Sequence, residues 1–182
     1  MTEISLHIMD IVQNSITAGA TLIEVSLCVS SKNDSLTVSV QDNGKGMSEE
    51  MTDGVTSPFV TTRTTRKVGL GIPLFAAGAQ ATGGSFHIES QEGNGTSIVA
   101  VYKLDHIDRP PIGDFAGTMR VLIVGNPQID FIVNTNLEGT TAKLATSEIK
   151  QVLGEVPIDT PDVSVWIGEN LTEMFPEKYK YM

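Results

Sequence analysis

The segment DIVQNSITA, residues 10–18, lies in a stretch whose apolar side chains recur at helical spacing. This period predicts a helix over residues 2–18, with Gly19 as the residue that ends it. Asp10 and Asn14 then lie one turn apart on the polar face of that helix. Oxygen atoms at this spacing can hold a hydrated magnesium ion or a water, or can simply form a solvated helix face.

A second motif, DNGKGM at residues 42–47, follows two stretches of alternating apolar residues, 23–30 and 36–41, which predict an antiparallel hairpin. Asn-Gly is a strong hairpin dipeptide, so a plain turn is one interpretation of the motif. However, no returning strand with apolar alternation follows it. The alternative is a base site, in which the Asp42 carboxylate accepts the exocyclic amine of adenine and the glycines let the backbone approach a flat base.

A third motif, PFVTTRTTRKVGLGIP at residues 58–73, runs into a helix predicted over residues 71–82. Residues 52–69 have no apolar period and predict a long mobile loop. The basic side chains of this loop are Arg63, Arg66 and Lys67. Together with the unpaired N–H groups of the helix start, these cations favour an anion site, and a flexible loop with incidental charges is the alternative.

A fourth motif, GNGT at residues 93–96, joins strands predicted over residues 85–90 and 96–103. Thr96 opens the second of these strands and can pack behind the base site. A plain turn is an equal alternative.

The four motifs, in this order over residues 3–104, resemble the N box, G1, G2 and G3 motifs of the GHKL ATP-binding superfamily. This superfamily groups gyrase-type topoisomerases, heat-shock chaperones, histidine kinases and mismatch-repair ATPases. Residues 10–21 are most similar to mismatch-repair ATPases, whereas residues 58–71 and 93–97 resemble histidine kinases more. The resemblance implies an α/β fold of the Bergerat type, a two-layer sandwich with helices on one face of a mixed β-sheet.

The resemblance also implies ATP and Mg²⁺ as ligands. Asn14 would ligate the Mg²⁺ that the ATP phosphates hold, and Asp42 would bind the adenine amine. Gly44 and Gly46 would shape the base pocket, and Thr96 would lie near the adenine. The phosphate contacts that the resemblance implies are Thr61, Thr62, Arg63, Arg66, Lys67, Gly69, Leu70 and Gly71.

Two departures from the family affect the expected activity. Hydrolysing members carry glutamate where this chain has the shorter Asp10, which is therefore the candidate catalytic base. They also draw a phosphate-contacting lysine from a following domain, for which residues 110–182 look too short. We therefore expect a slow ATPase or a nucleotide-dependent switch. The alternatives are a protein kinase that acts on a Ser or His of a partner, similar to the anti-sigma-factor kinases, and a non-enzymatic ATP-sensing or scaffold module.

The length and composition of the chain limit its expected location and its expected partners. The chain has 182 residues, a single cysteine, Cys28, and no apolar run long enough for a membrane span. These features predict a cytoplasmic protein without a membrane partner. The net charge of −10 argues against a nucleic-acid partner. A protein partner is expected, and the sequence leaves a homodimer open.

A shift in composition near residue 110 predicts two units, an ATP-binding domain over residues 1–108 and a small α+β extension over residues 109–182. In the extension, strands are predicted over residues 118–125 and 129–136. Helices are predicted over residues 147–153 and from Thr160-Pro161 onward. The expected core of the extension consists of Val121, Ile123, Phe131, Val133, Val163, Trp166 and Ile167.

Overall fold

The computed structural model of the protein describes residues 3–56 and 71–182. The helices are α1 (Ile4–Thr17), α2 (Glu49–Thr56), α3 (Gly71–Ala81), α4 (Phe115–Gly125), α5 (Thr146–Leu153) and α6 (Pro161–Met174). The strands are β1 (Leu22–Ser30), β2 (Ser35–Asp42), β3 (Ser85–Gln91), β4 (Gly95–Lys103), β5 (Asp130–Leu137) and β6 (Thr140–Ala145). A short 3-10 helix at Glu177–Tyr179 follows α6. In the described ranges, no helix is both long enough and apolar enough to cross a membrane.

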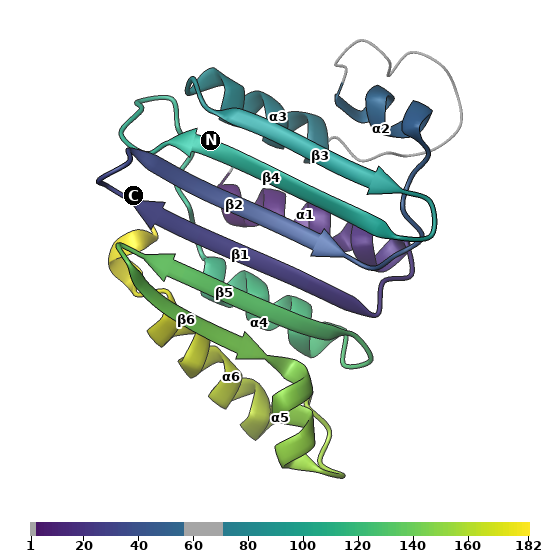
Figure 1. The fold of residues 1–182 in the computed structure, drawn as a ribbon. Coiled ribbons are helices and arrows are strands. Elements are labelled where there is room, and N and C mark those ends of the chain that lie inside the picture. The colour runs from purple at the N-terminus through teal and green to yellow at the C-terminus, as the bar shows by residue number, and fades with distance from the viewer. Residues whose placement is uncertain (1–2, 57–70) are drawn as a thin grey trace.

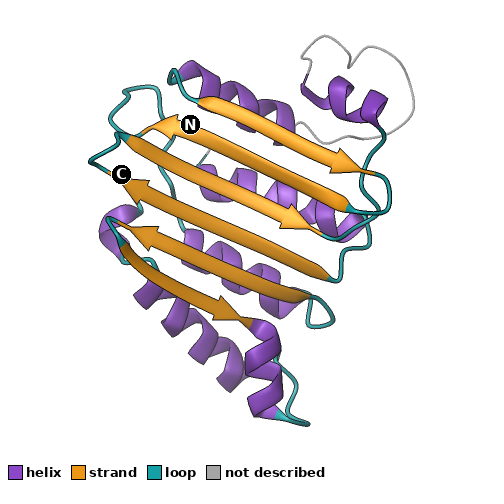
Figure 2. Ribbon diagram, viewed as in Figure 1, coloured by secondary structure: helices purple, strands orange, loops and turns teal. Residues whose placement is uncertain are grey.

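The strands form one six-stranded sheet in the order β3-β4-β2-β1-β5-β6. β1 pairs antiparallel with β2 and parallel with β5, and the other neighbouring pairs are antiparallel. The sheet is therefore mixed. Figures 1 and 2 show α1, α3, α4 and α6 packed on one of its faces. This arrangement confirms the two-layer α/β sandwich that the sequence predicts.

The core lies between the sheet and this helical layer. In β1, Ile23, Val25 and Leu27 are buried, whereas the residues between them are partly exposed. On α1, the predicted apolar face is buried against the sheet, and the helix ends before Gly19, whose φ is +76°. A left-handed conformation suits glycine because it has no Cβ. Each fully buried aliphatic side chain contributes about 1.5–3 kcal/mol relative to an exposed one.

The strand predicted over residues 118–125 is wrong, because this segment belongs to helix α4. The buried residues of α4 recur at helical spacing, and the Asp114 side chain caps the helix by accepting a 3.2 Å hydrogen bond from the N–H of Gly117. Val121, expected in the core, is therefore 62% exposed. Trp166, also expected in the core, is 49% exposed on α6.

The observed structure differs from the prediction at two further short elements, α2 and β6. Residues 52–56, expected to begin a loop, form the end of helix α2. Strand β6 was not predicted, although it pairs antiparallel with β5. β6 is an edge strand, and an edge strand needs few apolar residues. Its sequence, with two threonines and Lys143, therefore shows no clear apolar alternation.

The segment after residue 108 continues the same sheet and core. β5 lies beside β1, with Val133 opposite Val25. The first N–H groups of α1 donate to carbonyls from this segment, Ile4 to Pro111 at 3.0 Å and Ser5 to Ile112 at 2.9 Å. Residues 109–182 thus supply the hydrogen-bond acceptors that helix α1 needs at its start. The division of the chain at residue 108 stays a prediction.

Candidate functional site

The site begins with Asp42, the last residue of β2, whose side chain points toward α1 and is only 9% exposed. Its carboxylate accepts a 2.6 Å hydrogen bond from the hydroxyl of Ser15 and a 2.8 Å hydrogen bond from the N–H of Gly44. Ser15 itself is 3% exposed on α1. The helix and the loop after β2 therefore hold the carboxylate in one orientation.

The loop after Asp42 is fixed to α1 and to the start of β1. The N–H of Lys45 donates to the carbonyl of Ala18 at 3.0 Å. The side-chain oxygen of Asn43 accepts hydrogen bonds from the N–H groups of Thr21 and Leu22, each at 2.9 Å. The DNGKGM motif is thus not a hairpin turn, because its hydrogen bonds join it to other segments.

The same loop is also fixed to the β3–β4 hairpin. The N–H of Met47 donates to the hydroxyl of Ser90 at 2.8 Å, and the N–H of Gly93 donates to the carbonyl of Lys45 at 2.8 Å. Gly46, with a φ of +66°, lies so close to the Gln91 carbonyl that a Cβ would overlap it. Glycine is therefore required here for both its conformation and its size.

Thr96 lies on β4 directly opposite Asp42. Its hydroxyl is 2.9 Å from that of Ser90. Gly44 lies on the other side of the carboxylate, and a Cβ on Gly44 would lie 2.9 Å from the Cβ of Ala18. The structure thus brings together four of the residues singled out in the sequence: Asp42, Gly44, Gly46 and Thr96.

Asp10 and Asn14 lie one turn apart on α1, as the sequence predicts, and Asn14 immediately precedes Ser15. Asp10 is exposed and Asn14 is partly exposed. Within the described part of the chain, the carboxamide of Asn14 makes no hydrogen bond. Both side chains therefore present oxygen atoms that solvent or a ligand can reach.

Gly71, the first residue of α3, lies directly against Asp10. A Cβ on Gly71 would be 2.7 Å from the Cβ of Asp10 and 3.3 Å from one of its carboxylate oxygens. The start of a helix carries unpaired N–H groups and a partial positive charge, which favour a neighbouring anion. The Asp10–Asn14 face of α1 and the N-terminus of α3 thus adjoin.

His7 lies one turn before Asp10 and was not identified from the sequence as a buried group. It is 6% exposed, and its ring centroid lies 5.9 Å from that of Phe75 on α3. Among residues 3–56 and 71–182, the buried Nδ1 atom has no hydrogen-bond partner. Burial lowers the pKa of His7, and the nearby charge of Asp10 opposes this shift in part. The imidazole is therefore neutral at neutral pH.

The other predicted phosphate contacts are Thr61, Thr62, Arg63, Arg66, Lys67, Gly69 and Leu70, and all of them lie outside the described residues. Gly71 is the one member of that set that the structure places. Ser15 was missed as a site residue, although the sequence holds it next to Asn14.

The chain matches, over residues 2–106, the family model described as histidine kinase-, DNA gyrase B-, and HSP90-like ATPase. It therefore belongs to this family. The match spans the N-box helix, the Asp42 loop and the β3–β4 hairpin, and it confirms the GHKL resemblance. The chain thus contains a GHKL ATPase-type nucleotide-binding domain.

Two characterised relatives are kinases by name. The chain is 41% identical over 61 residues to sporulation kinase D of Bacillus subtilis (strain 168). This aligned segment covers 34% of this chain and 12% of the relative. The chain is 27% identical over 89 residues to the sensor histidine kinase ZraS of Escherichia coli (strain K12). This second aligned segment covers 49% of this chain and 19% of the relative. The similarity thus spans less than a fifth of either relative.

The fold is similar to a crystal structure of the N-terminal domain of a DNA repair protein. The TM-score is 0.53 at 14% sequence identity, over 85% of this chain and 58% of that chain. This likeness extends past residue 106 and supports the arrangement of the sheet and helices.

Proposed function

We propose that the protein binds Mg·ATP between α1, the loop after β2 and the start of α3, and works as a nucleotide-dependent switch with slow ATP hydrolysis. The observation that carries this proposal is the buried Asp42 carboxylate, held by Ser15 and Gly44 beside a glycine-lined loop. The proposal includes a protein partner and a cytoplasmic location.

Asp42 has the chemistry to read adenine. An ionised carboxylate offers about four lone-pair sites on its two oxygens. Ser15 and Gly44 each occupy one of these sites. The remaining sites accept the N–H of an exocyclic amine, which adenine carries at the position where guanine carries a carbonyl. A Cβ on Gly44 would lie 2.9 Å from the Cβ of Ala18 and 3.0 Å from a carboxylate oxygen of Asp42, so glycine lets this loop lie close to α1 and to the carboxylate.

The phosphates would lie toward Asn14 and Gly71. Mg²⁺ prefers oxygen ligands and keeps several waters, so the Asn14 side-chain oxygen and the phosphates suit it. The N-terminus of α3 at Gly71 favours the negative charge of a phosphate. The cations Arg63, Arg66 and Lys67, in the segment that enters α3, would add attraction in a chain of net charge −10.

Asp10 is the candidate general base for hydrolysis. A base must come within about 2.6–3.2 Å of the attacking water to remove its proton as the water attacks the γ-phosphate. Aspartate is one methylene shorter than glutamate, so its carboxylate reaches less far from α1. Slow turnover follows from this shorter reach.

The second candidate function is a protein kinase that transfers the γ-phosphate to a Ser or His of a partner. It is favoured by the similarity to two proteins named as kinases. Labelled ATP separates the two candidates, because a kinase labels an added partner whereas an ATPase releases labelled phosphate. Binding without either reaction would indicate a non-enzymatic ATP sensor.

Isothermal titration calorimetry with Mg·ATP tests the proposal. Replacing Asp42 by Ala should weaken ATP binding roughly tenfold to more than a hundredfold, because a hydrogen bond to a charged group contributes about 1.5–3 kcal/mol. Asn14→Ala should weaken ATP only when magnesium is present. The matched control is Asp159→Ala, which removes an exposed carboxylate from the segment before α6. The proposal is wrong if the wild type binds no nucleotide, or if Asp42→Ala binds ATP as tightly as the control.

A further inference from the structure

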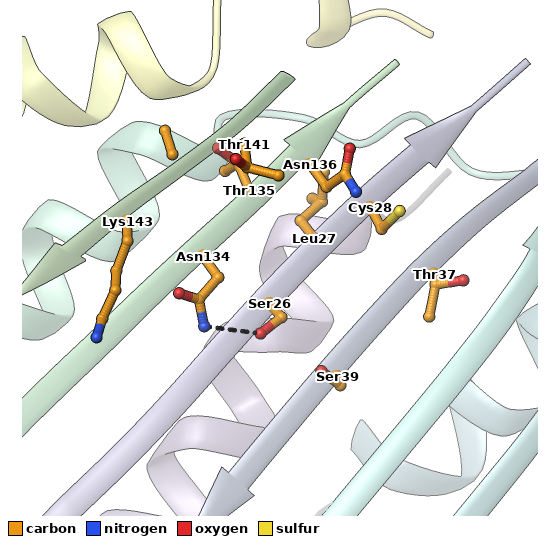
Figure 3. Close-up of a pocket in the computed structure, with 11 residues that line it drawn as sticks. Ser26, Leu27, Cys28, Thr37, Ser39, Asn134, Thr135, Asn136, Thr141 and Lys143 are labelled. Atoms are coloured by element: carbon orange, nitrogen blue, oxygen red, sulfur yellow. Dashed lines mark hydrogen bonds between the residues drawn. The ribbon is translucent and has the colours of Figure 1, made fainter. Parts of the chain in front are cut away.

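The two outer surfaces of the sandwich differ in chemical character. Figures 1 and 2 show the face of the sheet opposite the helices as open, and Figure 3 shows a hollow on it of about 440 Å³ that small polar side chains line. On this face, Asn134 donates to the hydroxyl of Ser26 at 3.2 Å and to the carboxylate of Glu24 at 2.7 Å. A carboxylate in the middle of the open face disfavours an apolar partner there, because covering it would remove its water.

The outer surface of the helical layer instead exposes apolar side chains. The helices lie in the order α3, α1, α4, α6 across the sheet, and α4 contacts both α1 and α6. Two grooves flank α4, one of about 700 Å³ beside α1 and one of about 540 Å³ beside α6. Each of the three helices exposes a large apolar side chain along them: Leu6 on α1, Val121 on α4 and Val165 on α6. An exposed apolar surface shared by several elements is typical of an interaction site.

The groove between α1 and α4 has apolar walls. Met9 of α1 and Val124 of α4 line it together with Leu6 and Val121. The two residues of each helix are three positions apart, so each pair lies along one side of its helix. Gly117, one turn before Val121, also lines the groove and has no side chain to fill it. The groove is therefore an apolar channel that follows the two helices.

The backbone of this surface selects a helix rather than an extended strand as the occupant. The N–H and C=O groups inside α1 and α4 are paired within each helix, so they offer no hydrogen bonds to an extended peptide. A helix pairs its own backbone groups and packs its apolar side chains into the groove between two other helices. α4 has 11 residues, a length of roughly 16–17 Å, which about three turns of a partner helix would cover.

The charges around the two grooves select a basic helix. The acidic residues that line the grooves are Glu3, Asp114, Glu169 and Glu173. The basic residue that lines them is Arg120, whose Nε donates to the hydroxyl of Ser164 at 3.1 Å. Lys180 offsets part of the negative charge, because its Nζ lies 3.9 Å from the Asp114 carboxylate. A second copy of the chain would bring a like acidic rim against this one, whereas a helix rich in lysine or arginine complements it.

We propose that the groove between α1 and α4 binds a basic amphipathic helix of a partner protein, with the apolar side of that helix against Leu6 and Val121. The inference rests on the proposed function in one respect, because it names the kind of partner that the nucleotide-dependent switch would use. The groove and the nucleotide site share α1: Met9 lines the groove, whereas Asp10 lies against Gly71 of α3. Partner and nucleotide would therefore bind on different sides of α1, and neither has to displace the other.

A phage-displayed library of random peptides, selected on the full chain without nucleotide, tests the proposal. With peptides of about 16 residues, we expect the enriched sequences to carry lysine or arginine and to place apolar residues at spacings of three and four. Because nucleotide is absent, a failed selection would leave the proposed Mg·ATP site untouched. A library that yields no enriched peptide, or only peptides without this pattern, overturns the proposal.

Fluorescence polarisation with the most enriched peptide locates its binding site. Val121→Glu should weaken binding at least about tenfold, because it buries a carboxylate against the apolar side of the peptide. The matched control is Val152→Glu, at an exposed valine of α5, which should bind the peptide as tightly as the wild type does. Either carboxylate attracts a basic peptide in general, so a loss confined to Val121→Glu reports contact with the groove.

A milder pair of substitutions keeps the proposal testable if Val121→Glu does not fold. Leu6→Ala should weaken peptide binding roughly fivefold, through the lost apolar contact. Leu74→Ala, at an exposed leucine of α3 outside both grooves, should leave binding unchanged. Equal affinities for the wild type and all the variants overturn the proposal. So does a wild-type dimer, seen by sedimentation equilibrium, that Val121→Glu or Leu6→Ala dissociates, because a second copy would then occupy the groove.

Discussion

The hydroxyl of Ser15 on α1 donates a 2.6 Å hydrogen bond to the carboxylate of Asp42 at the end of β2. This bond joins the helix that carries the proposed magnesium ligand, Asn14, to the strand that carries the proposed adenine acceptor. Because Asn14 and Ser15 are consecutive, a shift of α1 would move both ends of the nucleotide site together. Ser15 is therefore a positioning residue for Asp42.

Replacing Ser15 by Ala should weaken ATP binding roughly two- to tenfold, because a freed Asp42 side chain must be ordered on binding at a cost of about 0.5–1.5 kcal/mol. Calorimetry with and without magnesium checks this. The loss should be the same in both conditions, in contrast to Asn14→Ala. Ser147→Ala, at an exposed serine of α5, is the control. Unchanged affinity in Ser15→Ala would show that Gly44 alone orients the carboxylate.

Two glycines of α3 should respond in opposite ways to alanine. A Cβ at Gly71 would lie 2.7 Å from the Cβ of Asp10, so Gly71→Ala should destabilise the protein by about 1–3 kcal/mol through overpacking. A Cβ at Gly78 would lie 3.6 Å from Tyr102, an ordinary contact, so Gly78→Ala should stabilise it by up to about 1 kcal/mol. Urea unfolding measures both. Equal stabilities for the two variants would contradict the packing of α3 against Asp10.

The buried His7 predicts how stability depends on pH. Burial lowers the pKa of His7 in the folded state, so below its ordinary value of about 6.5 the unfolded chain binds a proton that the folded chain does not. Its contribution to the free energy of unfolding is therefore fully present above this pH and is lost progressively as the pH falls below it. His7→Met replaces the imidazole beside Phe75 by an apolar side chain that does not titrate. This variant should therefore lose less stability as the pH falls.

Denaturant unfolding between pH 5 and pH 7.5 measures this effect. The control is His87→Met, at a side chain that is 68% exposed. If the wild type and His7→Met lose stability in parallel as the pH falls, the buried imidazole is not the group responsible.

The sequence predicts most of the fold because the relevant signals are local. The period of α1 and the alternation in β1 and β2 involve neighbouring residues, and both predictions are confirmed. α4 was mistaken for a strand because valine and isoleucine favour strands and an exposed residue, Val121, hides the helical period. A single segment does not show which of its apolar residues face solvent.

The sequence likewise predicts only part of the candidate site. The motifs placed Asp42, Gly44 and Thr96 near one another, and the structure brings them together. The bond between Ser15 and Asp42 joins residues 27 positions apart, and only the packing of α1 on the sheet creates it. The burial of His7 likewise depends on Phe75 in a different helix.

Removing the extension should destabilise the whole molecule. A chain of residues 1–108 loses β5, which pairs with β1, and the carbonyls of Pro111 and Ile112, which accept from the start of α1. We expect this chain to aggregate or to unfold at a lower temperature than the full chain. A chain of residues 1–114 keeps the two carbonyls and separates their effect from that of β5. If residues 1–108 are monomeric and as heat-stable as the full chain, the extension is an independent domain.

The last prediction concerns turnover at Asp10. If Asp10 is a general base limited by its reach, Asp10→Glu should raise the rate of phosphate release, because the added methylene brings the carboxylate closer to the attacking water. Asp10→Asn should abolish release and leave ATP affinity nearly unchanged, since an amide does not accept the proton. Steady-state phosphate release from the three proteins, each at saturating Mg·ATP, measures the effect. Asp162→Asn, at an exposed carboxylate in the first turn of α6, is the control for a lost charge. Brisk wild-type turnover that survives Asp10→Asn would show that another group activates the water. Asp10 would then contribute only to the solvated face of α1 beside Gly71.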